Sequence, residues 1–264
     1  MSKALRFLKL YFHAFAISCF VFAGGFLRRR HRVLLYIIRN HFRAAAPLER
    51  PSALLPKVEL QEFFQNHRQL TLLEPLSVDG NISLLELAVI GLLIRQAQPQ
   101  RIFEIGTFDG RTSINMMANA PIGCRLFTLD LPSDEAGKTQ FRVAADDMKY
   151  IQKAVSGARI RGTEFEPNIT QLLGDSATFD YKNYNGTFDV VFVDGSHAYD
   201  YVKSDTEVAL RLLKPNGGLI VWHDYDTDWW PGVTRALNEF YSGRKELRGV
   251  RHVNGTALAY AFVK

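Results

Sequence analysis

Short apolar runs alternate with longer amphipathic stretches from residue 83 to the end of the chain. The apolar runs predict buried strands at 101–106, 125–131, 171–175, 188–195 and 219–225, and the other stretches predict helices at 83–97, 111–120, 136–156, 198–213 and 232–242. A hairpin is expected at 251–263, around the turn residues Asn254 and Gly255. Strands and helices that alternate in this way form a mostly parallel sheet with helices on both faces, so we expect a three-layer α/β domain.

The N-terminal part of the chain has a different composition. Residues 10–27 contain no formally charged side chain and are long enough to be considered a membrane span, and RRRHR follows directly. Three arrangements fit this pattern: a span, helices lying on an anionic membrane surface, or a helical arm packing on the body or on a second subunit of a homodimer. The heavier positive charge after the segment would leave the body of a spanning protein in the cytoplasm. We therefore expect membrane-associating helices at 1–43, a proline-containing linker at 44–57 and one domain at 58–264.

The basic residues are unevenly distributed along the chain. The net charge is +5, but residues 1–43 hold nine Lys or Arg and no Asp or Glu. The remaining 23 basic residues are outnumbered by 27 acidic ones, so the body is mildly acidic. A nucleic-acid-binding domain needs a basic surface on the body itself, and nucleic acid is therefore not expected as a partner.

A loop with two glycines follows the first predicted strand. It reads Glu104-Ile-Gly106-Thr107-Phe-Asp-Gly110-Arg-Thr112. The glycines permit a tight turn and close approach of a ligand to the backbone, and the next helix offers free N–H groups at its N-terminus. The spacing differs from the Gly-x-Gly-x-x-Gly of dinucleotide-binding folds, which argues against a pyrophosphate site. Taken alone, the loop is also compatible with an ordinary strand–helix turn.

Acidic residues end the next two predicted strands. Asp130, about twenty residues past the glycine loop, could accept hydrogen bonds from both hydroxyls of a ribose. Asp175 and Ser176 follow Gly174, and Asp175 could accept a hydrogen bond from the exocyclic amine of adenine. Both positions also have a structural interpretation, because Asp and Ser are frequent helix N-caps.

Asp194 and His197 follow the most apolar strand of the chain, FDVVFVDG. Ligands of parallel sheets bind at the carboxyl ends of the strands, so Asp194 would lie beside the reacting group. His197 could act as a general base toward a hydroxyl, since the pKa of imidazole lies near neutral pH. It could instead cap the helix that follows.

The next strand ends in His223 and Asp224. Because adjacent strand ends face one cleft, these side chains could meet Asp194, and two carboxylates with an imidazole suit Mg²⁺ or another divalent cation. Without a metal, Asp224 would orient His197. The loop at 226–230 could form a wall of the acceptor pocket or pack on the body.

Taken in order, these motifs resemble the class I S-adenosylmethionine (SAM)-dependent methyltransferases, and among them the family-24-type branch. The resemblance covers residues 83–224 and rests on EIGTFDGRTS, FTLD, LLGDS, FDVVFVDGSHAYDYVKSD and LLKPNGGLIVWHD. It implies a Rossmann-like methyltransferase fold with SAM as cofactor. It also implies that the loop from Glu104 to Thr112 holds the methionine end of SAM, that Asp130 binds the ribose hydroxyls and that Asp175 lies near the adenine.

The motifs are also similar to the catechol O-methyltransferase type. In that type, acids equivalent to Asp194 and Asp224 hold magnesium and a lysine is the base, whereas here His197 stands at the base position and Tyr225 at the third metal-ligand position. The resemblance implies O-methylation of a small-molecule, glycan or lipid-linked acceptor. Two alternatives stay open: an NAD-dependent oxidoreductase or hydroxylase-like enzyme on the same fold, and a membrane-bound scaffold with a degenerate methyltransferase fold.

Overall fold

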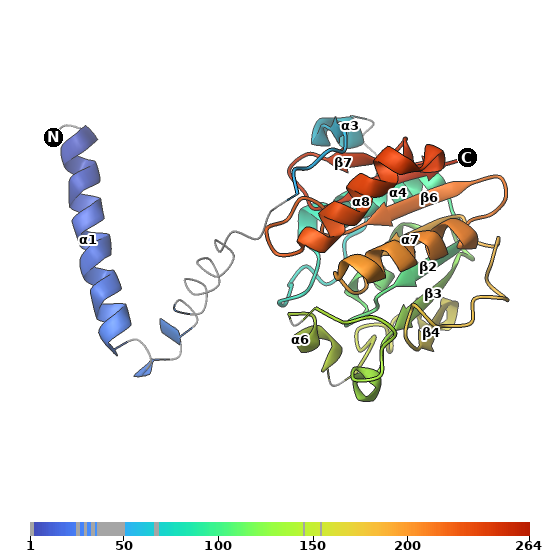
Figure 1. Ribbon diagram of the computed structural model, residues 1–264, viewed down its shortest axis with the longest axis horizontal. Helices are drawn as coiled ribbons and strands as arrows, with labels where there is room; N and C mark the ends of the chain where they lie inside the picture. Colours follow the sequence, from blue (N-terminus) through green and yellow to red (C-terminus); the bar gives the residue numbers. More distant parts are fainter. Residues whose placement is uncertain are drawn as a thin grey trace. The chain divides into compact units, whose positions relative to one another are not determined.

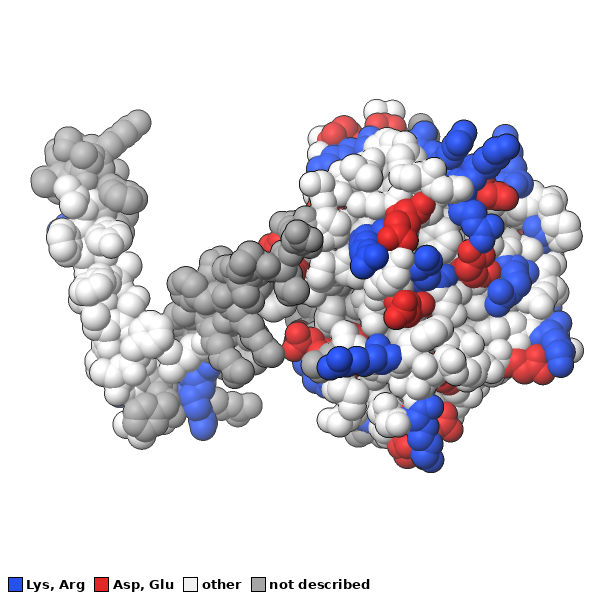
Figure 2. All heavy atoms as spheres, in the orientation of Figure 1, with Lys and Arg blue, Asp and Glu red and all other residues white. Residues whose placement is uncertain are grey.

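The computed structural model describes residues 3–24, 27–28, 31–32, 35, 51–65, 69–144, 146–153 and 155–264, and the chain divides into two compact units, Met1–Arg50 and Pro51–Lys264. In the first unit, α1 (Lys3–Gly24) is a helix of 22 residues (Figure 1). Phe12, Phe15 and Phe20 of this helix are exposed, and its surface is largely uncharged in Figure 2. Among the described helices, none is long and apolar enough to cross a membrane.

The second unit begins at Pro51, before the domain boundary expected at residue 58. The Tyr225 hydroxyl accepts hydrogen bonds from the backbone N–H groups of Leu54 and Leu55, and it donates to Asn238. Further along, the short strand β1 (Lys57–Val58) pairs in parallel with β7 (Arg251–Val253). Residues 51–57 are therefore part of the folded unit and not a linker, while 44–50 lie outside the described residues.

Eight strands form one sheet in the order β1-β7-β8-β6-β5-β2-β3-β4. The strands not yet given are β2 (Arg101–Ile105), β3 (Arg125–Asp130), β4 (Ile169–Leu173), β5 (Val190–Val193), β6 (Gly218–Trp222) and β8 (Ala259–Val263). β8 runs antiparallel to β6 and β7, and the other pairings are parallel, as the sequence predicts. The chain order reverses where β2 lies between β5 and β3, and ligands of such sheets bind outside the strand ends at this point.

The helices of the second unit largely agree with the sequence pattern. They are α3 (Leu60–Phe64), α4 (Leu84–Ala97), α5 (Arg111–Asn119), α6 (Met148–Ile151), α7 (Tyr199–Leu212) and α8 (Pro231–Gly243), with 3₁₀ turns η2 (Ser133–Glu135), η3 (Glu166–Asn168) and η4 (Lys245–Leu247). As predicted, α4 starts at a capping box of Ser83 and Glu86. The helix expected at 136–156 is wrong, because only α6 forms there. In this stretch, the backbone N–H of Gln140 donates a hydrogen bond to the carboxylate of Asp175 and not to a helical carbonyl group.

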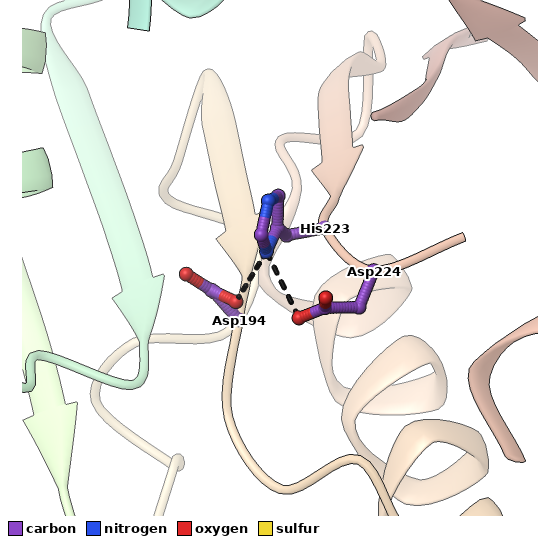
Figure 3. Close-up of side chains that lie close together, drawn as sticks. All are labelled: Asp194, His223 and Asp224. Atoms are coloured by element: carbon purple, nitrogen blue, oxygen red, sulfur yellow. Dashed lines mark hydrogen bonds and ion pairs between the residues drawn. The ribbon is translucent and has the colours of Figure 1, made fainter. Parts of the chain in front are cut away.

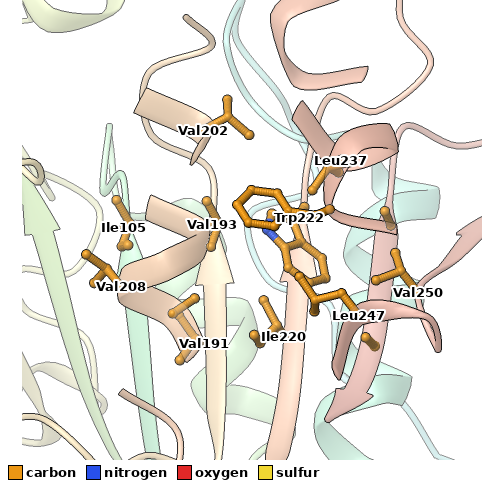
Figure 4. Close-up of a cluster of buried hydrophobic side chains, with 14 of the residues drawn as sticks. Ile105, Val191, Val193, Val202, Val208, Ile220, Trp222, Leu237, Leu247 and Val250 are labelled. Atoms are coloured by element: carbon orange, nitrogen blue, oxygen red, sulfur yellow. The ribbon is translucent and has the colours of Figure 1, made fainter. Parts of the chain in front are cut away.

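The sheet is fixed by a hydrophobic core on each face. Val190 and Phe192 of β5 pack with α4 and α5, whereas Val191 and Val193 point to the opposite face and pack with α7 and α8 (Figure 4). Each such side chain stabilises the fold by roughly 1.5–3 kcal/mol when fully buried. Since both faces are covered, the residues that follow each strand are held in fixed positions at one edge of the sheet.

Candidate cofactor and catalytic site

A cavity lies at the carboxyl ends of β2 to β6. Ten of the twelve predicted site residues line it: Gly106, Thr107, Thr112, Asp130, Asp175, Ser176, Asp194, His197, His223 and Asp224. They come from five different strand ends that are far apart in the sequence, and the parallel sheet brings them together. Glu104 and Gly110, the other two, do not face the cavity.

Gly106 and Gly110 are required by the packing of the loop after β2. Gly106 has φ +96°, and a Cβ there would lie 2.0 Å from the carbonyl oxygen of Asp194. The loop can therefore rest against the end of β5 only if this residue has no side chain. Gly110 has φ +87°, and a Cβ would lie 2.7 Å from Cγ1 of Ile160. The absence of a side chain therefore allows α5 to begin in close contact with Ile160.

Glu104 lies behind the cavity wall and is fully buried. The hydroxyl of Ser113 donates to its Oε2, and Oε1 has no hydrogen-bond partner in the part of the chain that the structure describes. Burial raises the pKa of Glu104 to about 8. The structure thus places this residue under the loop, where it can affect a cofactor only through the loop.

Asp130 and Asp175 line the cavity with their oxygens already engaged. Oδ2 of Asp130 accepts from the ammonium group of Lys153 at 2.7 Å and from the hydroxyl of Ser156. Asp175 accepts from the N–H of Gln140 at 2.7 Å and from the hydroxyl of Tyr201 at 2.9 Å. These partners of Asp130 could not be predicted, because they follow α6 in a stretch that the sequence pattern predicts as one long helix.

His223 lies between two carboxylates (Figure 3). Its Nδ1 is 2.9 Å from Oδ2 of Asp224 and 3.2 Å from Oδ1 of Asp194. Burial alone would lower the pKa of His223, but the charges of Asp224 and Asp194 hold it well above its usual value. Burial raises the pKa of Asp194, whereas the nearby His223 and His197 keep the pKa of Asp224 well below its usual range despite burial.

The same three side chains have the donor set of a cation site. Oxygens of Asp194 and Asp224 and a nitrogen of His223 all lie within 4.8 Å of one another. Two carboxylates and an imidazole suit a divalent cation, so the predicted ligands are placed together. Tyr225 is not among them, because its hydroxyl forms hydrogen bonds with the backbone N–H of Leu54 and the side chain of Asn238.

His197 is held by carboxylates at both ring nitrogens. Nδ1 is 2.5 Å from Oδ1 of Asp147, Nε2 is 2.7 Å from Oδ2 of Asp224, and the ring stacks on Trp230 with centroids 4.0 Å apart. Burial would lower the pKa of His197, but the charge of Asp224 and the hydrogen bonds that the ring donates to both carboxylates raise it to about 10. The two carboxylates favour the protonated imidazole. Both ring nitrogens are engaged, so His197 can act as the predicted general base only after one of these contacts opens.

Asp147 and Trp230 complete the site, and the sequence pattern assigned no role to Asp147. Asp147 is 3% exposed and also accepts from the hydroxyl of Ser196 and the backbone N–H of His197. No local motif distinguishes it from Asp146 beside it. Trp230 comes from the loop considered for the acceptor wall and lines the cavity, whereas its neighbour Trp229 is exposed.

Asp224 has a left-handed backbone conformation with φ +65°. This conformation is uncommon outside glycine, although aspartate adopts it more readily than most residues. The strain turns the chain directly after β6. It places the carboxylate of Asp224 between His197 and His223.

Part of the chain matches a known protein family. Residues 103–225 match the model of the family Methyltransf_24, described as "Methyltransferase domain". This match confirms the resemblance that the motifs carry.

A curated relative covers part of the chain. It is "Uncharacterized protein R132" of Acanthamoeba polyphaga mimivirus, with 32% identity over 139 residues, which is 52% of this chain and 57% of that protein. The chain thus matches little more than half the length of this relative.

Solved structures with a similar course of the chain include two O-methyltransferases. One is TomG from Streptomyces achromogenes in complex with SAM, with a TM-score of 0.46, 23% identity and coverage of 84% of this chain and 94% of that one. The other is from Bacillus cereus in complex with S-adenosylhomocysteine, with a TM-score of 0.47, 17% identity and coverage of 85% and 96%.

Replacing Glu104 with Gln should change how stability depends on pH. Between its ordinary value of 4.5 and about 8, this carboxyl group is protonated in the folded chain and ionised in the unfolded one. The free energy of unfolding of the wild type is therefore lowered by this group as the pH rises. The loss is absent below pH ~4.5, grows by about 1.4 kcal/mol per pH unit through this window, and is complete above pH ~8. Glu104→Gln cannot ionise, so it should gain stability over the wild type as the pH rises.

The measurement is urea unfolding of both proteins between about pH 5 and pH 8. Glu135→Gln, at an exposed position in η2, is the control and should follow the wild type. A stability difference between Glu104→Gln and the wild type that stays constant with pH would contradict the assignment.

Proposed function

The chain carries a methyltransferase domain over residues 103–225, and we propose that it transfers the methyl group of SAM to a hydroxyl oxygen. The observation that carries the proposal is that the matched segment places the loop at Gly106, Asp130 and Asp194 on one cavity at the switch point of the sheet. The acceptor in this proposal is a small molecule, a glycan or a lipid-linked compound with a free hydroxyl group.

The cavity suits a cation-bearing cofactor. Its lining includes six aspartates, at positions 109, 130, 147, 175, 194 and 224, and one lysine, Lys153. Even with His197 and His223 protonated, the lining has a net negative charge, which favours the positive sulfonium of SAM. In the proposal, Asp130 accepts from the ribose with the oxygen that Lys153 and Ser156 leave free.

The transfer itself requires alignment of the acceptor oxygen, the methyl carbon and the sulfur. Asp194 is the better proton acceptor of the two carboxylates beside His223, because burial raises its pKa while that of Asp224 is lowered. We therefore assign proton removal to Asp194. His197 holds Asp224 in place, and it would become a base only after giving up one of its carboxylate contacts.

A divalent cation such as Mg²⁺ fits the donor set of Asp194, His223 and Asp224, and when bound it would acidify the acceptor hydroxyl. The proton on Nδ1 of His223 faces the same two carboxylates that the cation would bind. A metal ligand must be a neutral imidazole, so the cation and this proton exclude each other.

Calorimetric titration with S-adenosylhomocysteine tests the cofactor. We expect binding in the micromolar range, about −8 kcal/mol. Asp130→Asn should weaken it by tenfold or more, because a charge-assisted hydrogen bond is lost. Asp134→Asn, an exposed acid close by in the chain, should bind as the wild type does.

Three outcomes of that titration would contradict the proposal or redirect it. Absence of binding by folded wild-type protein would reject SAM as cofactor. Binding of NAD(H) in its place would favour the oxidoreductase alternative. Binding of S-adenosylhomocysteine without methyl transfer from SAM to any of a broad set of hydroxyl compounds would favour the scaffold alternative.

Titration with Mg²⁺ in two buffers of different ionisation enthalpy tests the cation. Binding should release a proton from His223, so the measured heat should depend on the buffer. Asp224→Asn should weaken binding, and Asp200→Asn, at an exposed position of α7, should not. Heat that does not depend on the buffer would exclude His223 as a ligand, and no heat at all would exclude the cation.

We also propose that residues 1–43 bind an anionic membrane surface. The support is the exposed apolar surface of α1 and the nine basic residues without an acidic one in this part of the chain. Packing of this arm on a second copy of the chain stays a prediction.

Co-sedimentation of the full chain with anionic vesicles tests the membrane proposal. Phe15, 60% exposed on α1, is replaced by Glu, and Leu76, 83% exposed on the second unit, receives the same change as control. Phe15→Glu should lower binding about tenfold or more, since an aromatic side chain leaves the apolar phase. Equal binding of Phe15→Glu, Leu76→Glu and the wild type would reject the surface.

A further inference from the structure

Residues 146–153, here named the α6 segment, form one wall of the cavity. Asp147, Tyr150, Ile151 and Lys153 of this segment line it. Its only regular structure is the four-residue helix α6, and it is not part of the sheet. The position of the α6 segment therefore depends on side-chain contacts.

Three polar contacts tie the α6 segment to different parts of the second unit. Lys153 pairs with Asp130 at the end of β3, and Lys149 pairs at 2.7 Å with Asp79 in the loop before α4. The third contact joins Asp147 to the loop after β5. Lys149 and Asp79 are largely exposed, so their ion pair contributes little, and the buried contacts decide whether the α6 segment stays in place.

Asp147 makes the most extensive of these contacts. Its two oxygens accept from the Ser196 hydroxyl at 2.9 Å, the His197 backbone N–H at 3.1 Å and His197 Nδ1 at 2.5 Å. The His197 ring, stacked on Trp230 and held at Nδ1, has one direction left for Nε2, and in that direction lies Asp224 at 2.7 Å. Asp147 thus sets the rotation of the imidazole.

We propose that Asp147 is a positioning residue: it latches the α6 segment onto the loop after β5 and, through the same contact, holds His197 against Asp224. Opening of the α6 segment removes the partner of Nδ1, and His197 then loses its fixed direction. The site is fully assembled only while the cavity is covered, which is how closing segments act in many enzymes. The latch is independent of the proposed function, whereas its consequence for methyl transfer rests on that function.

Trypsin cleavage of the native full chain after Lys149 and Lys153 measures opening of the α6 segment, because a closed segment is cut only from its open state. Asp147→Asn should raise the cleavage rate at these two bonds about tenfold or more, since a buried charge-assisted hydrogen bond is weakened. Asp146→Asn, at the exposed neighbouring position, is the matched control and should be cut at the wild-type rate. Equal rates for Asp147→Asn and the wild type would overturn the latch.

A second variant breaks the latch from the other side and shows whether the effect is local. His197→Phe keeps a ring against Trp230 but has no Nδ1, so it too should speed cleavage after Lys149 and Lys153. Combining it with Asp147→Asn should add much less than the two single effects together, because both remove the same contact. Fully additive effects would overturn the assignment of the latch to this pair.

Positioning is measured from the ring N–H protons of His197 by NMR of the chain labelled at histidine. His252, whose Nε2–H donates to the carbonyl oxygen of Thr256 at 2.8 Å, is the internal reference. Asp147→Ala, which has no acceptor oxygen, should remove the Nε2–H signal of His197 as well as the Nδ1–H signal, and the His252 signal should not change. A Nε2–H signal of His197 that persists would show that Asp224 and Trp230 fix the ring without Asp147, and it would overturn the positioning role.

S-adenosylhomocysteine, added to the cleavage assay, separates this inference from the proposed function. It should slow cleavage of the wild type, and slow that of Asp147→Asn less. If it protects neither protein while Asp147→Asn still opens the segment, the latch is supported and the cofactor assignment is rejected. If it protects both equally, the link between Asp147 and closure over the cofactor is rejected.

Discussion

The site is organised by one electrostatic constraint: carboxylates that are close together in a poorly solvated cavity need positive charge between them. Asp194 and Asp224 flank Nδ1 of His223, while Asp224 and Asp147 flank the ring of His197. Each imidazole thus reduces the repulsion between two acids that would otherwise be costly to bury. The left-handed backbone at Asp224 is the local strain that this arrangement requires.

The ends of the strands could be predicted because buried strands appear in the sequence as short apolar runs. Apolar runs such as the one before Asp194 can only be interior strands, and parallel strands present their following residues at one edge. That reasoning brought Asp130, Asp194 and His223 together without any structure. Glu104, in contrast, does not line the cavity, because it lies within β2, where successive side chains point to opposite faces of the sheet.

The remaining part of the site could not be predicted, because it comes from a segment whose sequence pattern predicts one long helix, whereas its described residues form only the short helix α6. The side chains of Asp147, Lys153 and Ser156 contact residues that are distant in the sequence, and no spacing rule connects them to Asp130 or His197. A polar segment read by itself suggests a surface helix. Only the tertiary fold shows that its acids and bases complete a cavity.

The hydrogen bonds of the Tyr225 hydroxyl determine where a folded fragment of this chain has to begin. It binds the backbone at Leu54 and Leu55 and the side chain of Asn238, directly beside Asp224 in the chain. A fragment cut at the proline-rich boundary that composition suggests would remove residues 54 and 55 and leave buried groups unsatisfied next to the site. A fragment that is meant to fold as the second unit therefore has to begin at Pro51.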